Sequence, residues 1–258
     1  MTKNQAFTIL QRFGGIRAAR IITENTKKLS KIKVLYMAYL LRRGTPVAKI
    51  IHKKWFYGLA FYTNKHTLDP RPDTETLVSA VISDCTDNHP KRILDLGTGT
   101  GCIICSLVKN IPSASGMAID ISRPALRVAK RNVKNLGLNH LIKLKRTSFN
   151  SAHKIKEKFD IIVSNPPYID KNDTRVNDGA MHDPKIALYA DNNGLAAYET
   201  IAKNAKNWIK PNGKIYIEIG IDQGAPIKQI FSENNWAFIE SQNDLGGIER
   251  VLIFRYNK

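Results

Sequence analysis

The sequence predicts an α/β fold, a doubly wound and mostly parallel sheet that follows a small helical N-terminal domain. From residue 93 to residue 238, short apolar runs alternate with longer segments of helical spacing, the pattern of strands joined by helical crossovers. A glycine-rich turn follows one apolar run and an Asn-Pro-Pro turn follows another. With 258 residues and 43% apolar side chains, the chain can bury a sizeable core, as one large domain or as a main domain with a small one.

The first 54 residues predict short helices. Gly14-Gly15 is expected to break the first helix from the second. Six apolar residues then recur at helical spacing and predict one apolar helix face, namely Leu29, Ile32, Leu35, Tyr36, Tyr39 and Leu40. Gly44 is expected to end this helix. Thr45 then predicts an N-cap, with Pro46 at the first helical position of a short helix whose inward residues are Val47, Ile50 and Ile51.

A linker and the strands of the sheet follow. Residues 56–67 predict a β-hairpin with Asn64-Lys65 at its turn. The sheet is expected to contain strands around residues 92–94, 117–119, 159–164 and 215–217, and residues 250–256 predict an added antiparallel strand.

Positive charge is concentrated in the first quarter of the chain. Residues 1–68 hold 14 Lys and Arg and one acid, Glu24, for a net charge of +13. Of the 40 basic and 22 acidic residues in all, 26 and 21 remain for the rest of the chain, a net charge of +5. A basic lobe attracts polyanions, and the alternative is a lysine-rich, solvated helix surface.

A glycine-rich turn predicts a nucleoside site. Asp95 and Leu96 precede it, and it consists of Gly97, Thr98, Gly99, Thr100 and Gly101. Glycines allow a tight turn and close approach to a ligand. Asp120, 23 residues past Gly97, ends the next strand, where a carboxylate can accept both hydroxyls of a ribose. Dinucleotide sites prefer a final glycine where Cys102 stands, so the pattern favours S-adenosylmethionine over a dinucleotide.

The run Asn165, Pro166, Pro167 and Tyr168 predicts a catalytic turn. It follows the apolar segment 159–164, and the two prolines must end that strand. Asn165 is therefore expected at the carboxyl edge of the sheet, where open α/β sheets bind ligands. There its side-chain carbonyl and the Pro166 backbone carbonyl can accept both protons of a planar NH2 group, whose face stacks on Tyr168.

These motifs together resemble those of the release factor glutamine methyltransferases, the PrmC/HemK family. The resemblance covers most of the chain after Trp55, and the run Pro70-Arg71-Pro72-Asp73-Thr74-Glu75 is its most specific part. The other matching segments are residues 56–61, the glycine loop, residues 119–122 with 125–126, residues 165–169 and 183–188, Gly213, Glu218-Ile219-Gly220 with Gln223, and residues 244–251. One departure is Ser148, which stands before Phe149 where the family usually has an acidic residue.

The resemblance implies a Rossmann-like class I methyltransferase. It would use S-adenosylmethionine to methylate the glutamine side chain in the Gly-Gly-Gln motif of class 1 peptide chain release factors. It implies a basic helical substrate-recognition domain at residues 1–54, a hairpin linker at 55–70 and the methyltransferase domain at 71–258. The implied cofactor site includes the glycine loop, Asp120, Phe149 and Asn165, and the implied substrate site is the turn 165–168.

Several charged residues have open roles. Arg71, Asp73 and Glu75 either lie at the mouth of the site or serve the start of a helix that Asp73 or Thr74 caps. Asp183 is expected to shape the polar loop over residues 171–183, and Glu218 to fix the sheet edge, with catalytic assistance as the alternative for both.

Other classes of protein are weighed on composition. No apolar run approaches the ~20 residues of a membrane span, and no signal peptide is expected. Cys85, Cys102 and Cys105 do not make a zinc site, so no metal and a cytoplasmic setting are expected. Two alternatives stay open. One is an amino-methyltransferase of a nucleic-acid base, which would suit the basic lobe, and the other is a non-enzymatic scaffold that binds S-adenosylmethionine. A weak RNA contact through the basic N-terminal lobe is also expected.

Overall fold

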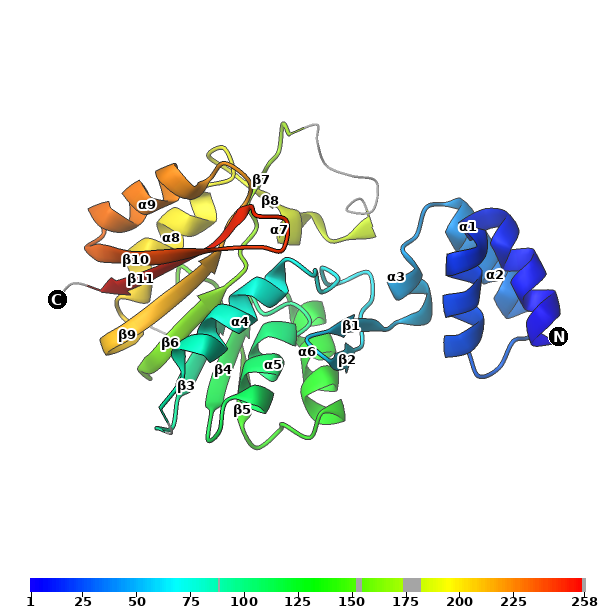
Figure 1. Ribbon diagram of the computed structural model, residues 1–258, viewed down its shortest axis with the longest axis horizontal. Coiled ribbons are helices and arrows are strands. Elements are labelled where there is room, and N and C mark those ends of the chain that lie inside the picture. The colour runs from blue at the N-terminus through cyan, green and yellow to red at the C-terminus, as the bar shows by residue number, and fades with distance from the viewer. Residues whose placement is uncertain (88, 152–154, 174–181, 257–258) are drawn as a thin grey trace.

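The computed structural model describes residues 1–87, 89–151, 155–173 and 182–256. Its centre is a seven-stranded sheet in the order β10-β11-β9-β6-β3-β4-β5 (Figure 1). Strands β9, β6, β3, β4 and β5 run parallel, whereas β11 pairs antiparallel with both β9 and β10. The strands are β3 (Arg92–Leu96), β4 (Ser115–Asp120), β5 (Ile142–Arg146), β6 (Phe159–Ser164), β9 (Ile209–Glu218), β10 (Trp236–Asn243) and β11 (Glu249–Tyr256).

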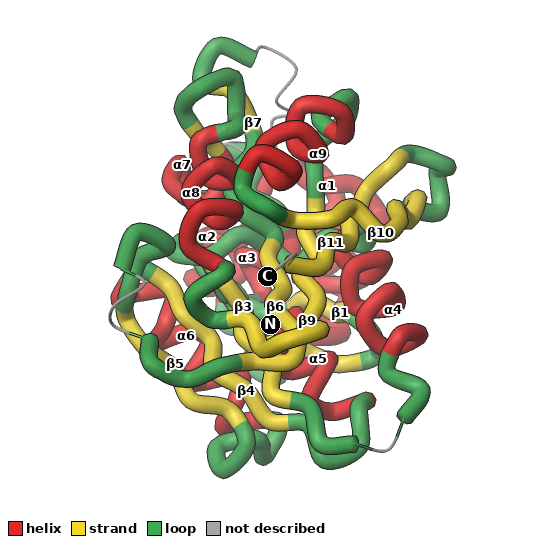
Figure 2. Tube along the Cα trace, turned by 90° about the vertical axis from the view of Figure 1, so that its left-hand side faces the viewer, coloured by secondary structure: helices red, strands yellow, loops and turns green. Residues whose placement is uncertain are grey.

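Helices cover both faces of this sheet, and successive strand residues serve opposite layers. On β3, Ile93 packs into the core under α4 (Thr74–Asp84), α5 (Cys102–Asn110) and α6 (Arg123–Asn135). The next residue, Leu94, packs into the core under α8 (Ala196–Ala205) and α9 (Gly224–Glu233). Figure 2 shows α9 and α4 on opposite sides of β10 and β11. This doubly wound arrangement confirms the predicted fold class and the added antiparallel strand.

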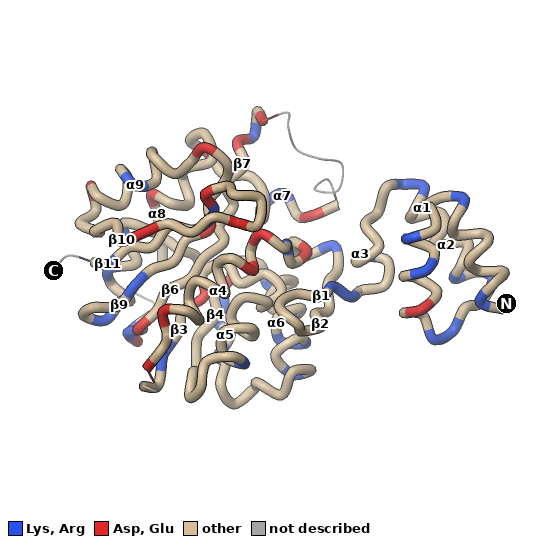
Figure 3. The backbone as a smooth tube through the Cα atoms, in the orientation of Figure 1, with Lys and Arg blue, Asp and Glu red and all other residues tan. Residues whose placement is uncertain are grey.

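The N-terminal helices form a separate small core. They are α1 (Lys3–Asn25), α2 (Lys31–Arg42) and α3 (Val47–Ile51). The backbone of α1 is non-helical at Gly15. Their buried residues form one cluster that includes Leu10, Ile22, Met37 and Ile50. In Figure 1 this N-terminal lobe lies to the right of the sheet, on the side where α6 and the strands β1 (Lys54–Phe56) and β2 (Leu59–Phe61) are found. Lys and Arg are concentrated on α1 and α2, as Figure 3 shows.

The apolar face expected on α2 is largely on the surface. Ile32 is 83% exposed, and Leu35, Tyr36 and Tyr39 are exposed as well. The helix instead buries Val34, Met37, Ala38 and Leu41. Both sets have helical spacing, because α2 is apolar around most of its circumference. Packing against α1 therefore selects the buried face, and the exposed set becomes a surface of the lobe.

Two local predictions are wrong by a few residues. The N-cap of α3 is Pro46, without a side-chain cap bond, and the helix begins at Val47, so Thr45 is not the cap. The hairpin consists of β1 (Lys54–Phe56) and β2 (Leu59–Phe61). Its turn is at Tyr57 and Gly58, which both have positive φ, the backbone that a two-residue hairpin turn requires. Asn64-Lys65 lies beyond it.

Two short parallel strands and a helical turn lie beside the carboxyl edge of the main sheet. These are β7 (Ile169–Asp170), α7 (Lys185–Leu188) and β8 (Tyr189–Ala190). Part of the predicted loop over residues 171–183, namely 174–181, lies outside the described residues. Within the described chain, no helix is both long and apolar enough to cross a bilayer.

Candidate functional site

The predicted motifs meet at the carboxyl edge of three neighbouring strands. In the parallel register, Leu96 of β3 pairs with Ile119 of β4 on one side and with Ser164 of β6 on the other. The glycine loop, Asp120 and Asn165 each follow one of these residues. The sheet therefore brings residues from three parts of the chain to one edge, where doubly wound folds bind ligands.

The glycine loop is held against the end of β4. Gly97, Gly99 and Gly101 all have positive φ, at 75°, 54° and 79°. The Asp120 carboxylate accepts the Gly99 N–H at 2.9 Å and the Ser122 N–H at 2.8 Å. These bonds orient the carboxylate and leave its remaining lone pairs for a ligand. Burial, offset in part by these bonds, raises the pKa of Asp120.

Asp95 supplies a second buried carboxylate beneath the loop. Its Oδ2 accepts the Thr98 hydroxyl at 2.5 Å, whereas its Oδ1 has no hydrogen-bond partner among the described residues. Burial is the main cause that raises the pKa of Asp95 to about 7.

Phe149 supplies an apolar wall beside the loop. A Cβ atom on Gly97 would lie 3.3 Å from the Cζ of Phe149, so a side chain at position 97 would be crowded as well as strained. The Phe149 carbonyl accepts the Asn204 amide at 2.9 Å, and the Ser148 hydroxyl lies 3.3 Å from that of Ser151. An aromatic ring, an open glycine backbone and two carboxylates fit a nucleoside with an amino-acid tail, as S-adenosylmethionine has.

Thr100 connects the loop to the hairpin linker. Its carbonyl accepts a hydrogen bond from the side chain of Asn132, at 2.9 Å. The same buried amide pairs with both backbone groups of Tyr62, at 2.7 and 2.9 Å. Sequence reasoning did not single out Asn132, because its role depends on a neighbour 70 residues away in the chain.

The Asn-Pro-Pro-Tyr turn is pinned at both ends. The side-chain nitrogen of Asn165 donates to the hydroxyl of Thr74 at 3.1 Å. The Tyr168 carbonyl accepts from Nε2 of Gln223 at 2.9 Å, and Oε1 of Gln223 accepts the Gly220 N–H at 3.0 Å. A Cβ on Gly194 would collide with the Tyr168 carbonyl oxygen. Burial raises the pKa of the Tyr168 hydroxyl to about 12, so that hydroxyl stays protonated at neutral pH.

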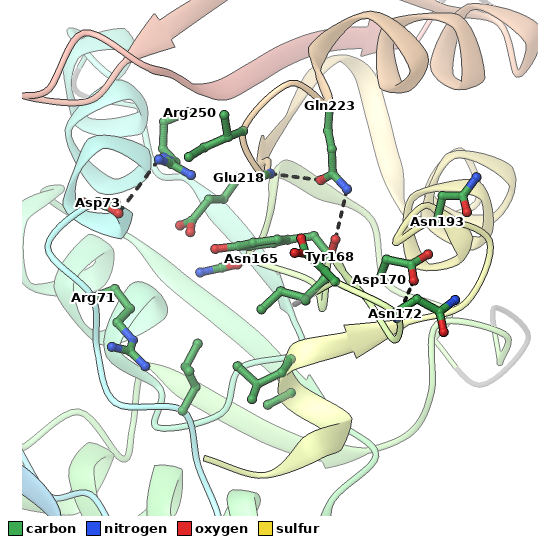
Figure 4. Close-up of a pocket in the computed structure, with 17 residues that line it drawn as sticks. Arg71, Asp73, Asn165, Tyr168, Asp170, Asn172, Asn193, Glu218, Gln223 and Arg250 are labelled. Carbon is green, nitrogen blue, oxygen red and sulfur yellow. Dashed lines mark hydrogen bonds and ion pairs between the residues drawn. The ribbon is translucent and has the colours of Figure 1, made fainter. Parts of the chain in front are cut away.

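A cleft of about 930 Å³ opens beside this turn. Figure 4 shows Asn165 and Tyr168 in its middle, with Arg71 and Asp73 on one side and Asn193 and Asp170 on the other. It is lined by Leu68, Arg71, Asp73, Asn165, Tyr168, Ile169, Asp170, Asn172, Asp173, Ala187, Leu188, Asn193, Glu218, Gly220, Ile221, Gln223 and Arg250. Neither the glycine loop nor Pro166 and Pro167 line it.

Glu218 lies at the base of the cleft, at the end of β9. Its side chain is buried, and its carboxylate accepts hydrogen bonds from Thr74 and Asn165. Burial, the largest effect, raises the pKa of Glu218 to about 7. The sequence predicted this residue as a support of the sheet edge, with catalytic assistance as the alternative, and the structure places it in contact with the predicted catalytic asparagine.

The charged run before α4 divides between two environments. Arg71 and Asp73 line the cleft, and Asp73 lies 3.9 Å from the Arg250 guanidinium. Glu75 instead turns away, and its Oε1 accepts the Tyr57 N–H of the hairpin at 2.7 Å. Asp73 is the N-cap of α4 by position but makes no capping bond through its side chain.

Asp183 belongs to a buried ion cluster. Its carboxylate lies 2.8 Å from Nζ of Lys49 on α3 and 2.7 Å from Nη2 of Arg71. Lys49 is itself buried and also pairs with Asp69 at 2.9 Å. The cluster ties the N-terminal helices to the cleft margin. It supports the structural reading of Asp183, since both of its oxygens face cations.

No group of His, Cys, Asp and Glu side chains suited to hold a metal ion occurs among the residues that the structure describes. Cys102 and Cys105 are buried in α5, and burial raises the pKa of both thiols. They pack in the core beneath α5.

Comparison with known proteins agrees with this geometry. The family model described as Methyltransferase small domain matches residues 69–183. The bifunctional methyltransferase of Rickettsia felis is 37% identical over 260 residues, covering 88% of this chain and 49% of that protein, so the chain spans about half the length of this relative. Among solved structures, the ribosomal protein L11 methylase of Lactobacillus delbrueckii subsp. bulgaricus aligns with a TM-score of 0.54 at 21% identity, covering 74% of this chain and 83% of that one, which shows the shared fold.

A relative of similar length establishes the family. The release factor glutamine methyltransferase of Agrobacterium fabrum is 40% identical over 218 residues, covering 82% of this chain and 75% of that protein. The aligned length takes in most of the chain, and the glycine loop, Asp120 and the turn at Asn165 stand together at one sheet edge as the sequence resemblance implied. The chain belongs to the release factor glutamine methyltransferase family.

Proposed function

We propose that this chain transfers a methyl group from S-adenosylmethionine to the side-chain amide nitrogen of the glutamine in the Gly-Gly-Gln motif of class 1 peptide chain release factors. The observation that carries the proposal is the position of Asn165. It stands between the glycine loop on one side and a cleft of about 930 Å³ on the other. Membership of the family supports the choice of donor and acceptor.

The donor would be held by the glycine loop and the residues around it. The Asp120 carboxylate would accept hydrogen bonds from the ribose hydroxyls, and Phe149 would pack against the base. The chemistry that S-adenosylmethionine supplies is a methyl group already activated by the positive sulfonium, so a covalent enzyme intermediate is unnecessary.

The acceptor would be oriented by the turn. An amide nitrogen is a poor nucleophile because its lone pair is delocalised into the carbonyl group. The Asn165 nitrogen faces Thr74, so its carbonyl oxygen is free to turn toward the substrate amide, beside the Pro166 backbone carbonyl. Two such acceptors hold the amide protons and direct the lone pair, and orientation of this kind contributes up to roughly 7–11 kcal/mol. Tyr168 would pack on the amide plane and exclude water.

The N-terminal lobe, residues 1–54, would recognise the protein substrate, with residues 55–70 as its linker to the methyltransferase domain at 71–258. Two features support this role. Basic residues gather on α1 and α2 (Figure 3), and the exposed face of α2 presents Leu35, Tyr36 and Tyr39. Aromatic and apolar anchors within a charged surface are typical of protein interfaces. A weak RNA contact through the same lysines, and a cytoplasmic location beside the ribosome, belong to this proposal.

The decisive experiment compares acceptors. Purified protein is incubated with methyl-labelled donor and with release factor, total tRNA or DNA in separate reactions. Label in release factor, located at the Gly-Gly-Gln glutamine by peptide mass spectrometry, is the expected result. Replacing that glutamine in the factor is the matched control and should abolish labelling. Label in nucleic acid alone would establish the base methyltransferase instead, and donor binding without transfer to any acceptor would indicate a scaffold.

A further inference from the structure

Glu218 has an oxygen for which the fold offers no partner. Its side chain is buried, with 1% of the residue exposed, yet it lines the cleft. Its carboxylate accepts bonds from Thr74 and Asn165, but Oε2 has no hydrogen-bond partner among the described residues. Figure 4 shows the carboxylate beside Asn165 and Tyr168. Buried polar atoms are almost always satisfied, so an unsatisfied one beside a cleft is suited to interact with a ligand.

We propose that the Glu218 carboxylate accepts the proton that the substrate amide releases when it is methylated. The proposal rests on the proposed function and assigns one more role in the same site. In the ground state the Asn165 and Pro166 carbonyls hold the two N–H groups, and once methyl transfer has made the nitrogen positive, Glu218 beside Asn165 would take one of these protons, which makes it a catalytic residue.

The proton balance of the reaction requires such an acceptor. The amide nitrogen forms a bond to the methyl carbon while the bond from that carbon to sulfur breaks, and the electron pair of the broken bond remains on sulfur. The nitrogen then carries a positive charge and still holds both of its protons. One proton must leave to restore the neutral N-methyl amide. Transfer to ionised Glu218 leaves a neutral carboxylic acid, so a positive sulfonium and a negative carboxylate are converted to neutral groups.

Other ionisable groups of the cleft are less suited to this task. The pKa of the Tyr168 hydroxyl is raised to about 12 by burial, so it holds its proton. Asp183 is engaged by Lys49 and Arg71. The Asp73 side chain is 57% exposed, at the rim beside Arg250. Asp170 lies across the cleft and accepts the N–H of Asn172.

The surroundings of Glu218 support proton exchange near neutral pH. Burial, the largest effect, raises its pKa to about 7, and the nearby Asp73 also raises it, whereas the Thr74 and Asn165 hydrogen bonds and the Arg250 charge lower it. A carboxylate with this pKa is ionised in part at neutral pH and is a stronger base than an exposed one. The titratable and charged groups around it are Asp73 at the N-cap of α4, Cys102 of α5, Tyr168 of the loop after β6, Tyr198 of α8 and Arg250 of β11.

The first test is the pH dependence of turnover with release factor. In the natural protein, kcat should fall as the pH drops through about 7, because protonated Glu218 cannot accept a second proton. Glu218→Gln keeps an oxygen for Thr74 and Asn165 but removes the base. It should lower kcat about 10- to 100-fold and abolish the fall of kcat at low pH, the acidic limb of the profile. The affinity for the methyl donor should be nearly unchanged. Asp73→Asn removes a neighbouring negative charge, so the limb should shift to lower pH. Glu240→Gln, at an exposed position on β10, is the matched control and should leave the profile as it is.

The second test needs no turnover. Infrared difference spectra of the protein alone, between about pH 5 and about pH 8.5, should contain a carboxyl band that titrates near neutrality and is missing from Glu218→Gln. Unchanged kcat with an intact acidic limb in Glu218→Gln would overturn the proposal, and so would a Glu218 carboxyl that does not titrate in that range. Absence of methyl transfer by the natural protein would instead refute the proposed function, and the infrared result would still decide the protonation of Glu218.

Discussion

The side-chain nitrogen of Asn165 donates to the Thr74 hydroxyl at 3.1 Å, which joins the turn after β6 to the first residue of α4. These residues are 91 positions apart in the chain. The Thr74 hydroxyl donates its proton to Glu218, so toward Asn165 it can only accept, and this places the nitrogen end of the Asn165 amide against the protein. Under the proposed function, the carbonyl end would thereby be presented to the substrate. Thr74 thus acts in the orientation of Asn165 as well as in the start of the helix.

Asn165→Ala should reduce turnover far more than donor affinity. The side-chain carbonyl is proposed to act on the substrate amide in the transition state, and removal of one oriented acceptor of this kind costs about 10²- to 10³-fold in kcat. Steady-state kinetics with release factor, together with calorimetry of the donor, measure both quantities. Thr74→Val tests the orientation itself and should give a smaller loss in kcat. Near-normal turnover in Asn165→Ala would refute the polarising role of this turn.

Asp120→Ala should weaken the binding of S-adenosylmethionine and of its demethylated product alike. A hydrogen bond to a charged acceptor contributes about 1.5–3 kcal/mol, so the dissociation constants should rise about 10- to 100-fold. Calorimetry at fixed pH measures this. Asp120→Asn serves as the matched variant, since it keeps the shape and one acceptor oxygen, and it should lose less. Equal affinity in all three proteins would exclude a ribose contact at this position.

Neutralising Lys27, Lys28, Lys31 and Lys33 together should raise the Michaelis constant for intact release factor. All four side chains are exposed on the N-terminal lobe, so the change should not disturb packing. Steering by these charges acts on association and is screened over a Debye length of ~8 Å at physiological salt. Methylation of a short glutamine peptide should stay nearly constant, and the difference between the substrates should shrink at high salt. Equal losses on both substrates would mean that these lysines support the fold.

Lys49→Met should destabilise the protein by about 3–5 kcal/mol, because it leaves the buried carboxylates of Asp69 and Asp183 without their shared cation. Urea unfolding of the purified protein measures the loss. Lys33→Met, at an exposed position on α2, is the control and should change stability by no more than about 0.5 kcal/mol. A loss in Lys49→Met as small as in the control would show that the cluster is solvated in solution.

The raised pKa of Glu218 makes stability depend on pH in a definite direction. Between its ordinary value of 4.5 and about 7, the folded protein holds a proton that the unfolded chain has released. The unfolded state therefore binds fewer protons, so the contribution of this residue to stability falls as pH rises through that window and is constant above it. Over the whole window the loss is about 3 kcal/mol.

Urea unfolding at several pH values, in the natural protein and in Glu218→Gln, isolates this effect. The difference in unfolding free energy between the two proteins should shift in favour of the variant as the pH rises from about 4.5 to about 7. A difference that is constant over this range would show that Glu218 has an ordinary pKa in the folded protein.

The alternation of apolar runs with helical segments was sufficient to predict the doubly wound fold, because parallel strands buried on both faces require continuous apolar residues. The glycine loop, Asp120 and the turn at Asn165 were also predictable from sequence. Each is a short local motif, and the rule that parallel strands end at one edge brings the motifs together.

Contacts between distant segments were decided only by the tertiary structure. The buried face of α2 could not be read from its sequence, because both the set that contains Tyr36 and the set that contains Val34 have helical spacing and the partner helix α1 selects between them. The partners of Lys49 and Asn132, and the pairing of Glu218 with Thr74 and Asn165, depend on burial, which raises the energetic importance of a hydrogen bond or charge and has no local signature in the chain.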